Sequence, residues 1–305
     1  MSDNETKAPQ LASSAEAEDK MIGALVGGRY KIARLLGTGN MARVYVAEQV
    51  NMERNVAVKL LQPELLVDET AGGRFQREVV AVSRLRSPHT ISFIDSGCTP
   101  EGVPYIVMEL LVGQTLRERL EEDNPIPWHE VVTVVEQLGH SLHEAHEAGV
   151  LHRDLKPDNV HYSHQPTPFQ PFIKLLDFGL AKLLDPQNEN DMMLTARRQT
   201  VGTPAYMAPE MIVEERPVDH RSDIYALGVM CLEMLTGQRP YQHKGTMQMA
   251  MAQVRDPIPS ARAINPALPE GADAFFESVM AKDPAHRPQS AIELAGQLRA
   301  LLFQG

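Results

Sequence analysis

Cysteine is scarce in this sequence, and the two that occur, Cys98 and Cys231, are far apart. Neither their number nor their spacing fits a disulfide framework or a zinc site. Disulfides persist in oxidising compartments and are rare where thiols are kept reduced. The scarcity therefore predicts a protein of a reducing compartment, with Cys231 a small core residue in an apolar run.

Basic charge and long apolar runs are also lacking. Lys and Arg number 29 against 40 Asp and Glu, a formal net charge of -11. This balance argues against a nucleic acid partner, which needs a basic surface. The apolar run at 226–235 is too short to cross a bilayer, and the acidic N-terminus does not resemble a signal peptide. We therefore expect a cytoplasmic protein without a membrane segment.

The remaining composition is that of a globular protein. Hydrophobic residues make up 43% of the 305 residues, enough to build one large domain or two lobes around real cores. Residues 1–27 contain no aromatic residue and are rich in Ala, Ser, Glu and Asp. Such a segment cannot bury enough apolar surface to offset its ordering entropy, so we expect a flexible or disordered N-terminal tail.

Strand patterns dominate from Tyr30 to Leu111. Five segments alternate in polarity or are rich in β-branched residues: 30–35, 43–47, 55–61, 91–94 and 105–110. Apolar residues recur at helical spacing over 73–85. A five-stranded antiparallel sheet with one helix makes a small α+β lobe, which we place at 28–111.

Helical spacing prevails from Thr115 onward. The segment 128–148 has one apolar face, whereas 223–236 is apolar on nearly all sides and ends at Gly237, a C-cap glycine. Two later segments, 272–280 and 291–302, also predict helices. We place a mostly helical second lobe at 112–303.

Two glycines flank Thr38 between the first two predicted strands. Gly37-Thr38-Gly39 leads into a strand, which argues against the dinucleotide-binding fingerprint and the P-loop, since both open a helix. Glycine here would let the backbone approach a phosphate closely. On these residues alone, a plain hairpin turn is the better interpretation.

A lysine and a glutamate in the first lobe form a candidate pair. Lys59 ends an apolar strand, where a lysine is often only a surface charge with a buried stem. Glu78 lies within the predicted helix 73–85 near apolar neighbours, where a partner is expected. A lysine held by this glutamate would present a fixed positive charge to phosphate groups.

Polar residues with complementary chemistry follow the helix at 128–148. The loop reads His152-Arg153-Asp154-Leu155-Lys156-Pro157-Asp158-Asn159. Phosphoryl transfer needs a carboxylate at the attacking hydroxyl, a cation for the γ-phosphate and an oxygen ligand for Mg²⁺. Asp154, Lys156 and Asn159 suit these tasks in that order. Asp177, at the end of an apolar strand in Leu176-Asp177-Phe178-Gly179, offers the second metal ligand.

With these residues in order, the sequence resembles the eukaryotic-like (bacterial Hanks-type) Ser/Thr protein kinases. Further matches are Arg43-Val44 after the glycines, Ala208-Pro209-Glu210 at the end of the activation segment, and the scaffold residues Asp223 and Arg287. The resemblance runs from about Arg29 to Leu302. It implies the two-lobed protein kinase fold and an ATP- and Mg²⁺-dependent enzyme, with Mn²⁺ as an alternative metal.

The resemblance also assigns roles. It implies Asp154 as the catalytic base, Lys156 as the γ-phosphate contact, the Lys59–Glu78 pair at the ATP phosphates, and Asn159 and Asp177 as metal ligands. The nucleotide-binding set would be Gly37, Thr38, Gly39, Val44, Ala57, Lys59, Met108 as gatekeeper, Glu109, Leu111, His161 and Asp177. Lys156 and Thr203 resemble the Ser/Thr-specific forms, which favours Ser or Thr over Tyr as acceptor.

Arg153 resembles the arginine that receives a phosphorylated activation-loop residue in this family. Thr195 and Thr200 lie between Asp177 and Glu210, with basic residues nearby. A phosphate there would pair strongly with a guanidinium and order the loop. We therefore expect autophosphorylation at one or both threonines, through a transient homodimer, although both also read as ordinary loop residues.

The sequence departs from the family pattern in three places. Ala42 replaces the third glycine of the Gly-rich loop, and small residues are tolerated there. His161 stands where an apolar residue usually lies under the adenine, and the simpler interpretation is a neutral packed ring. The Pro-rich segment 163–171 is longer than usual and reads as a surface insertion or a partner site.

Two other interpretations are open. A nucleotide-binding pseudokinase scaffold would usually lack residues of the Lys59, Asp154 or Asp177 type, and this chain has all three. A small-molecule phosphotransferase of the same fold would not need Thr203 and the segment ending at Glu210, which serve protein substrates. An active kinase acting on a protein substrate is the interpretation that the residues favour.

Overall fold

The computed structural model describes residues 19–39, 42–62, 79–163, 171–178, 204–213 and 217–303. By its internal contacts the chain divides into two compact units. Unit 1 comprises Met1–Pro63 and Ile94–Leu110, and unit 2 comprises Glu64–Phe93 and Leu111–Gly305. The segment Glu64–Phe93, which the sequence-based division places with 28–111, groups with unit 2.

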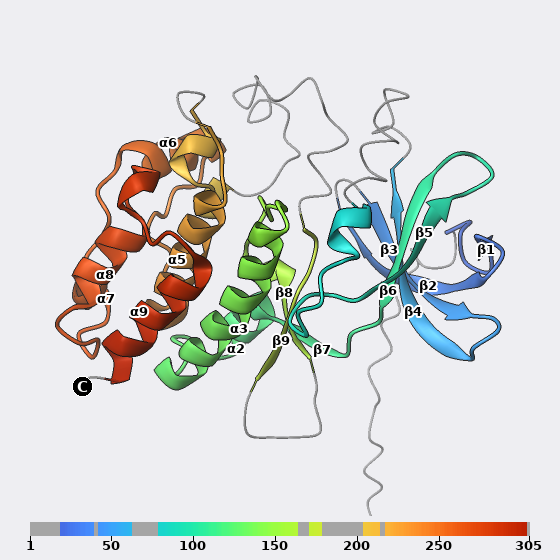
Figure 1. Ribbon diagram of the computed structural model, residues 1–305, viewed down its shortest axis with the longest axis horizontal. Coiled ribbons are helices and arrows are strands. Elements are labelled where there is room, and N and C mark those ends of the chain that lie inside the picture. Colours follow the sequence, from blue (N-terminus) through green and yellow to red (C-terminus); the bar gives the residue numbers. More distant parts are fainter. Residues whose placement is uncertain are drawn as a thin grey trace, which may run out of the picture. The chain divides into compact units, whose positions relative to one another are not determined.

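Unit 1 is built on one antiparallel sheet (Figure 1). Its strands are β1 (Leu25–Val26), β2 (Tyr30–Thr38), β3 (Ala42–Gln49), β4 (Arg54–Leu61), β5 (Phe93–Cys98) and β6 (Pro104–Glu109), in the order β1-β2-β3-β4-β6-β5. The sheet thus has six strands and not the predicted five. The additional β1 has only two residues, too few for an alternating pattern, and it lies within the segment 1–27 assigned to the tail. β5 begins two residues later than the predicted segment 91–94.

The sheet of unit 1 has one face on its own core. Side chains alternate between the two faces of a strand, so every second residue points to the same face. Tyr45, Val58 and Val107 are fully buried in one cluster with Tyr30 and Ile32. The residues between them along β3, β4 and β6 must therefore point to the opposite face of the sheet.

Unit 2 combines a small sheet with most of the helices. The sheet joins β7 (Gly113–Thr115), β8 (Val160–Ser163) and β9 (Phe172–Leu175). The α-helices are α2 (Leu116–Glu122), α3 (Trp128–Glu147), α5 (Arg221–Thr236), α6 (Thr246–Arg255), α7 (Ala261–Ile264), α8 (Ala272–Val279) and α9 (Ala291–Phe303). Four short 3₁₀ helices complete the described part: η3 (Pro157–Asn159), η6 (Pro204–Tyr206), η7 (Pro209–Met211) and η8 (Pro284–His286).

The apolar face of α3 is the main reason that this helix forms where it does. Val131, Val134, Val135, Leu138 and Leu142 recur at helical spacing and are all fully buried. This face packs against α5, α9 and β9, and Figure 1 shows α3 and α9 side by side. The predicted helix at 128–148 is confirmed. Of the predicted helix at 73–85, residues 79–85 are described, and 79–82 of these are helical.

Helix α5 is the centre of unit 2 because it is apolar on nearly every side. Such a helix is buried all round. It ends at Gly237, whose φ of 76° is the left-handed conformation that glycine adopts at low cost. A Cβ on Gly237 would also lie 2.5 Å from the Asn124 side chain, which donates to the Gly237 carbonyl at 2.9 Å. The predicted C-cap is therefore confirmed, for two reasons.

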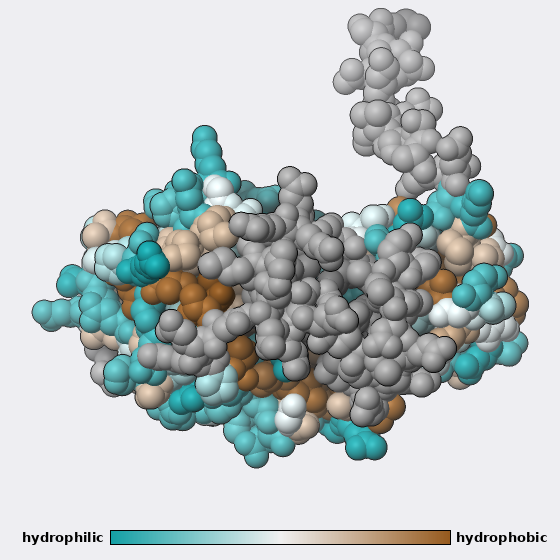
Figure 2. Space-filling model, turned by 90° about the horizontal axis from the view of Figure 1, so that it is seen from above, coloured by the Kyte–Doolittle hydropathy of each residue, from teal (hydrophilic) through white to brown (hydrophobic). Residues whose placement is uncertain are grey.

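Polar residues cover most of the described surface visible in Figure 2, and hydrophobic residues show there in smaller patches. This distribution agrees with a separate buried cluster inside each unit. Within the described ranges, no helix combines the length and the apolar character needed to cross a bilayer.

A buried ion pair ties three segments of unit 2 together. Arg287 donates to both carboxylate oxygens of Glu210, at 2.7 and 2.8 Å, and neither side chain is more than 1% exposed. Ser222 of α5 donates to the same carboxylate at 2.9 Å. Arg287 also donates to the Ala281 carbonyl at 2.7 Å. Because the Glu210 carboxylate is buried, its negative charge depends on Arg287 as its counter-ion.

We therefore expect Arg287→Ala to lower the free energy of unfolding by about 3–5 kcal/mol, since it leaves a buried carboxylate without its counter-ion. Urea unfolding followed by circular dichroism measures the change. Arg299→Ala is the matched control, because the Arg299–Glu136 pair has an arginine that is 59% exposed. The control should lose less than about 1 kcal/mol. Equal losses in the two variants would contradict this role of Arg287.

Candidate active site

The nucleotide-binding candidates of unit 1 share one face of its sheet. Val44 lies opposite Lys59, and Ala57 lies opposite Met108. Residues directly opposite one another, or two apart on a strand, point to the same face. These four side chains therefore share the face turned away from the core cluster of unit 1. The strand pairing thus brings together positions that are 64 residues apart in the sequence, Val44 and Met108.

The glycine turn joins this face at its end. Gly37 pairs with Val44, and the Gly39 N–H donates to the Ala42 carbonyl at 2.9 Å. The predicted hairpin around Gly37-Thr38-Gly39 is confirmed, with Thr38 as the last residue of β2. Glu109 ends β6 opposite Val56, and Leu111 follows as the first residue of the next part of unit 2.

In unit 2 a buried carboxylate holds the loop that follows α3. Asp223 is 2% exposed and accepts the backbone N–H groups of His152 and Arg153, each at 2.8 Å. The His146 ring nitrogen Nε2 lies 2.8 Å from the same carboxylate. Burial alone would raise the pKa of Asp223, but the hydrogen bonds from His146 and the loop backbone outweigh burial and lower it. The carboxylate therefore stays charged and fixes the path of the loop.

His152 links this loop to the segment after β9. Its Nε2 lies 2.7 Å from the Leu176 carbonyl, which can only accept, so Nε2 carries the hydrogen. Nδ1 then accepts the Asp154 N–H at 3.3 Å. The ring also packs on Phe178, with centroids 5.0 Å apart. His152 is fully buried, so it acts as a spacer that sets the distance between Asp154 and the segment 176–178.

Two predicted catalytic residues, Asp154 and Lys156, meet the predicted metal ligand Asn159 at the Asp154 carboxylate. Lys156 Nζ donates to Asp154 Oδ2 at 2.7 Å, and Asn159 Nδ2 donates to the same oxygen at 3.2 Å and to the Asp154 carbonyl at 2.7 Å. Two donors thus converge on Oδ2, and Oδ1 has no hydrogen-bond partner among the described residues. A carboxylate held in this way can receive a proton from a hydroxyl that approaches Oδ1.

Asp177 is the second oxygen ligand candidate, and the backbone places it beside Asn159. The N–H of Leu176, the residue before Asp177, donates to the Asn159 carbonyl at 2.8 Å. The Asn159 amide nitrogen is engaged with Asp154, so its oxygen is the atom that can serve a metal ion. One carboxylate and one amide oxygen fit Mg²⁺, which prefers few protein ligands and completes its shell with phosphate oxygens and water.

The backbone at this site adopts a costly conformation twice. Arg153 and Asp177 have φ values of 63° and 52°, in the left-handed region that residues with a Cβ rarely occupy. Each such residue costs roughly 1–3 kcal/mol and persists only where the surroundings enforce it. At Arg153 the bond to Asp223 does so, and at Asp177 the bonds of Leu176 to His152 and Asn159 do so.

His161, the candidate for the floor under the adenine, lies on β8 opposite Thr115. The adjacent Gly113 has a φ of 144°, and a Cβ there would lie 1.9 Å from the Tyr162 carbonyl and 3.1 Å from the His161 ring. Only glycine allows β7 to pass so close to β8. Sequence reasoning did not single out Gly113, although a glycine two residues after Leu111 was a usable signal.

Several predictions lie outside the described residues. These are the positions of Glu78, Thr195, Thr200 and Thr203, and most of the insertion 163–171. Their roles stay predictions.

Sequence reasoning missed a charged network beside the catalytic loop. Arg117 of α2 donates to Glu233 of α5 at 3.1 Å and to the Tyr206 hydroxyl at 2.6 Å. Tyr206 donates to the other Glu233 oxygen at 2.5 Å. The available signal was Glu233 itself, an acidic residue within the apolar stretch of α5 that follows Asp223.

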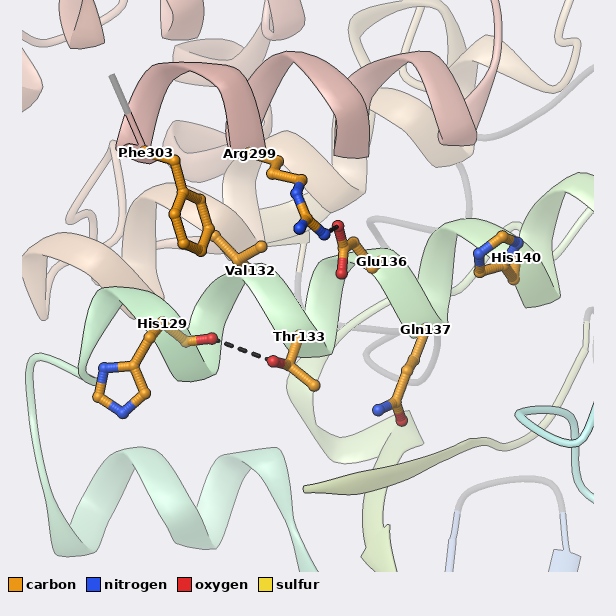
Figure 3. Close-up of a pocket in the computed structure, with 8 residues that line it drawn as sticks. All are labelled: His129, Val132, Thr133, Glu136, Gln137, His140, Arg299 and Phe303. Carbon is orange, nitrogen blue, oxygen red and sulfur yellow. Dashed lines mark hydrogen bonds and ion pairs between the residues drawn. The ribbon is translucent and has the colours of Figure 1, made fainter. Parts of the chain in front are cut away.

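A separate cavity of about 320 Å³ lies between α3 and α9 (Figure 3). Figure 3 shows Glu136 and Arg299 pointing toward each other across it, and their ion pair measures 2.7 Å. Phe303 borders the same cavity and packs edge-on against Trp128, with centroids 5.0 Å apart. None of the residues predicted for phosphoryl transfer lines this cavity, so the catalytic loop remains the candidate site.

We expect Asp223→Asn to lower the free energy of unfolding by about 2–4 kcal/mol near neutral pH, because an amide cannot accept all three hydrogen bonds. The folded-state pKa of Asp223 is lowered, so its contribution is present above the ordinary value of 3.8 and is lost as the pH falls through the folded-state value. The gap between wild type and variant should therefore narrow below about pH 4.

Urea unfolding of both proteins between pH 7 and pH 3 measures this gap. Asp123→Asn serves as the control, because the Asp123 side chain is 62% exposed and its loss should change little at any pH. A gap that stays constant down to pH 3 would show that the charge of Asp223 is not what holds the loop.

Comparison with known proteins agrees with this geometry. The family model described as the protein kinase domain matches residues 30–297. A serine/threonine-protein kinase of Myxococcus xanthus, pkn3, is 36% identical over 286 residues, which cover 93% of this chain and 52% of that protein. The serine/threonine-protein kinase PrkC of Bacillus subtilis is 33% identical and is covered over 41% of its length. The chain thus spans about half or less of these relatives.

A solved kinase structure shows the same fold. The crystal structure of the Mycobacterium tuberculosis PknI kinase domain aligns with a TM-score of 0.71 and 27% identity, and the alignment covers 92% of this chain and 98% of that one. The motif set, its geometry in unit 2 and the match over nearly the whole described chain lead to one assignment. This chain belongs to the protein kinase family and, within it, to the Hanks-type serine/threonine kinases of bacteria.

Proposed function

We propose that this chain transfers the γ-phosphoryl group of ATP to Ser or Thr hydroxyls of a protein substrate, and that Mg²⁺, or Mn²⁺ in its place, supports the reaction. The observation that carries the proposal is the Asp154 carboxylate, held by Lys156 at 2.7 Å and by Asn159 at 3.2 Å. The names of the relatives, all serine/threonine kinases, support Ser or Thr as acceptor.

In this proposal each residue of unit 2 has one task. Asp154 orients the acceptor hydroxyl and takes its proton as the bond to phosphorus forms. Lys156 lies beside that carboxylate and balances the charge of the transferred group. Asn159 and Asp177 would hold the divalent cation, which neutralises phosphate charge when bound. The bonds from Asp223 and His152 keep these residues in place without motion during the reaction.

The residues of unit 1 would bind the nucleotide. Lys59 would contact the phosphates, and Gly37 and Gly39 would let the turn backbone approach them. Val44 and Ala57 share a face with Lys59 and would pack on the adenine, with Met108 at its edge. The backbone of Glu109 and Leu111, together with His161 and Thr38, completes the proposed nucleotide contacts.

Regulation by autophosphorylation forms part of the proposal. Within the described ranges, no hydrogen bond or ion pair engages the guanidinium of Arg153, although its backbone is fixed by Asp223. A guanidinium on a fixed backbone suits a phosphate on Thr195 or Thr200. Transfer between the two copies of a transient homodimer would add this phosphate. The scarcity of cysteine supports a reducing, cytoplasmic setting for the reaction.

The first test is label transfer from γ-labelled ATP with Mg²⁺ or Mn²⁺, to the chain itself and to a generic protein acceptor. Asp154→Asn should reduce the rate by about 10²–10⁴-fold, because it removes the proton acceptor. Nucleotide binding, measured by thermal shift, should be retained, and Asp123→Asn should transfer label as the wild type does. Equal rates with and without the Asp154 carboxylate would refute its role. No transfer by either protein, with nucleotide still bound, would favour a pseudokinase.

The second test addresses the loop threonines. Mass spectrometry of wild-type protein incubated with ATP should find phosphate on Thr195, Thr200 or both, and the Asp154→Asn protein should carry none. Arg153→Gln should weaken the activating effect of that phosphate, because the guanidinium would no longer pair with it. Active protein with both threonines unmodified would exclude this mode of regulation.

A further inference from the structure

Asp19 fixes a turn that precedes β1 in unit 1. Its carboxylate oxygen Oδ1 accepts the Met21 N–H at 3.0 Å, and its backbone carbonyl accepts the Ile22 N–H at 3.0 Å. An aspartate that accepts the N–H two residues ahead favours a turn. Asp19 has no task in the proposed reaction, yet its side chain is only 10% exposed. A carboxylate so far withdrawn from water needs further partners.

The further partners of Asp19 lie on β3. The Tyr45 hydroxyl donates to the second carboxylate oxygen, Oδ2, at 2.9 Å, and Arg43 Nη1 lies 3.7 Å from the same oxygen. Burial raises the pKa of Tyr45, so the phenol keeps its proton and remains a donor. Both oxygens of Asp19 are thus in use, and the carboxylate joins the turn at 19–22 to the first half of β3.

The residues that follow this turn are bound to β2. The Gly23 N–H donates to the Ile32 carbonyl at 2.8 Å, and the Ile32 N–H donates to the Ala24 carbonyl at 2.9 Å. β1 continues the pairing, with Val26 opposite Tyr30. The segment 19–26 is therefore bound to both β2 and β3, the two strands that flank the glycine turn.

The contacts of Asp19 fall on either side of Val44. Arg43 and Tyr45 flank Val44 on β3, so their side chains point to the face opposite to it. Val44 is paired in turn with Gly37 of the glycine turn. Asp19 thus holds, from the core side of the sheet, the stretch of β3 whose other side is proposed to contact the nucleotide.

We propose that Asp19 is a positioning residue for ATP: by binding Tyr45 and Arg43 it fixes the first half of β3 and, through it, the glycine turn that covers the phosphates. Without this carboxylate the two strands gain freedom at the turn, and the nucleotide must order them as it binds, which lowers its affinity. Asp19 touches no substrate, so its loss should weaken ATP binding more than it slows transfer. This inference rests on the proposed kinase function and adds a residue outside the nucleotide-binding set.

Asp95 of β5 offers a control with the same chemistry elsewhere in unit 1. Its carboxylate accepts the Tyr30 hydroxyl at 2.7 Å and Arg29 at 2.5 Å, and its side chain is 21% exposed. Tyr30 pairs with Gln49, which lies six residues along β3 from Arg43, or about 20 Å at the usual rise of a strand. Loss of Asp95 therefore removes equivalent bonds from unit 1 far from the glycine turn.

The first measurement is the KM for ATP in label transfer to a generic protein acceptor. Asp19→Ala should raise this KM about three- to tenfold, at most the factor of one hydrogen bond to a charged group. The kcat and the KM for the acceptor should change less than about twofold, because the catalytic loop is untouched. Asp19→Asn should have a smaller effect, since its amide oxygen can still accept from Tyr45. Asp95→Ala should keep the wild-type KM for ATP.

Tyr45→Phe tests the same bond from its other end, because it removes the hydroxyl and keeps the ring in the core. It should raise the KM for ATP by less than Asp19→Ala does. The double variant should do no more than Asp19→Ala alone, because the two changes delete one shared interaction. Hydrogen exchange adds a measurement without ATP: Asp19→Ala should speed exchange of the backbone amides at 43–46, and Asp95→Ala should not.

An unchanged KM for ATP in Asp19→Ala, in protein that transfers label as the wild type does, would overturn the inference. So would equal increases in KM for Asp19→Ala and Asp95→Ala, or faster exchange at 43–46 without a change in KM, since either result would show a contribution to stability alone. Failure of the function is a separate result. If wild-type protein labels no acceptor, the kinase function is rejected, and the inference with it, whatever the exchange shows.

Discussion

The buried carboxylate of Asp223 is the constraint on which the candidate site depends. It reaches from α5, the helix at the centre of unit 2, to the backbone of His152 and Arg153. Two N–H groups and a histidine satisfy its oxygens, which makes a fully buried charge tolerable. Because α5 is itself immobilised by apolar packing on all sides, its hydrogen bonds also hold the loop at His152 and Arg153 in place. The loop therefore needs little buried apolar surface of its own.

The candidate site residues of unit 2 are positioned by the backbone more than by side-chain packing. Arg153 and Asp177 are held in the left-handed conformation, and His152 spans the space between their two segments. The strain is local and is offset by hydrogen bonds to Asp223 and the Asn159 carbonyl. Preorganisation of this kind keeps Asp154, Asn159 and Asp177 at fixed separations, which is what electrostatic stabilisation of a charged transition state requires.

Two arginine–glutamate pairs in unit 2 differ in how far they are buried. Arg287 and Glu210 are at most 1% exposed and hold η7 against α5 and η8. In the pair of Arg117 and Glu233 the arginine is 29% exposed and also reaches Tyr206 and Asp158. The first pair is closed to solvent and stabilises the fold, whereas the second leaves its arginine partly open to solvent.

The sequence alone determined the family, the helices predicted at 128–148 and 223–236, and the types of residue at the site, because periodicity, capping and motif order are local properties. Only the tertiary structure decided the short β1, the common face of Val44, Ala57, Lys59 and Met108, and the contacts of Asp223. Arg117, Tyr206 and Glu233 were invisible as a network because they lie on three elements separated by 89 and 27 residues. Spacing in sequence carries no information about such contacts, since they are set by how the helices pack.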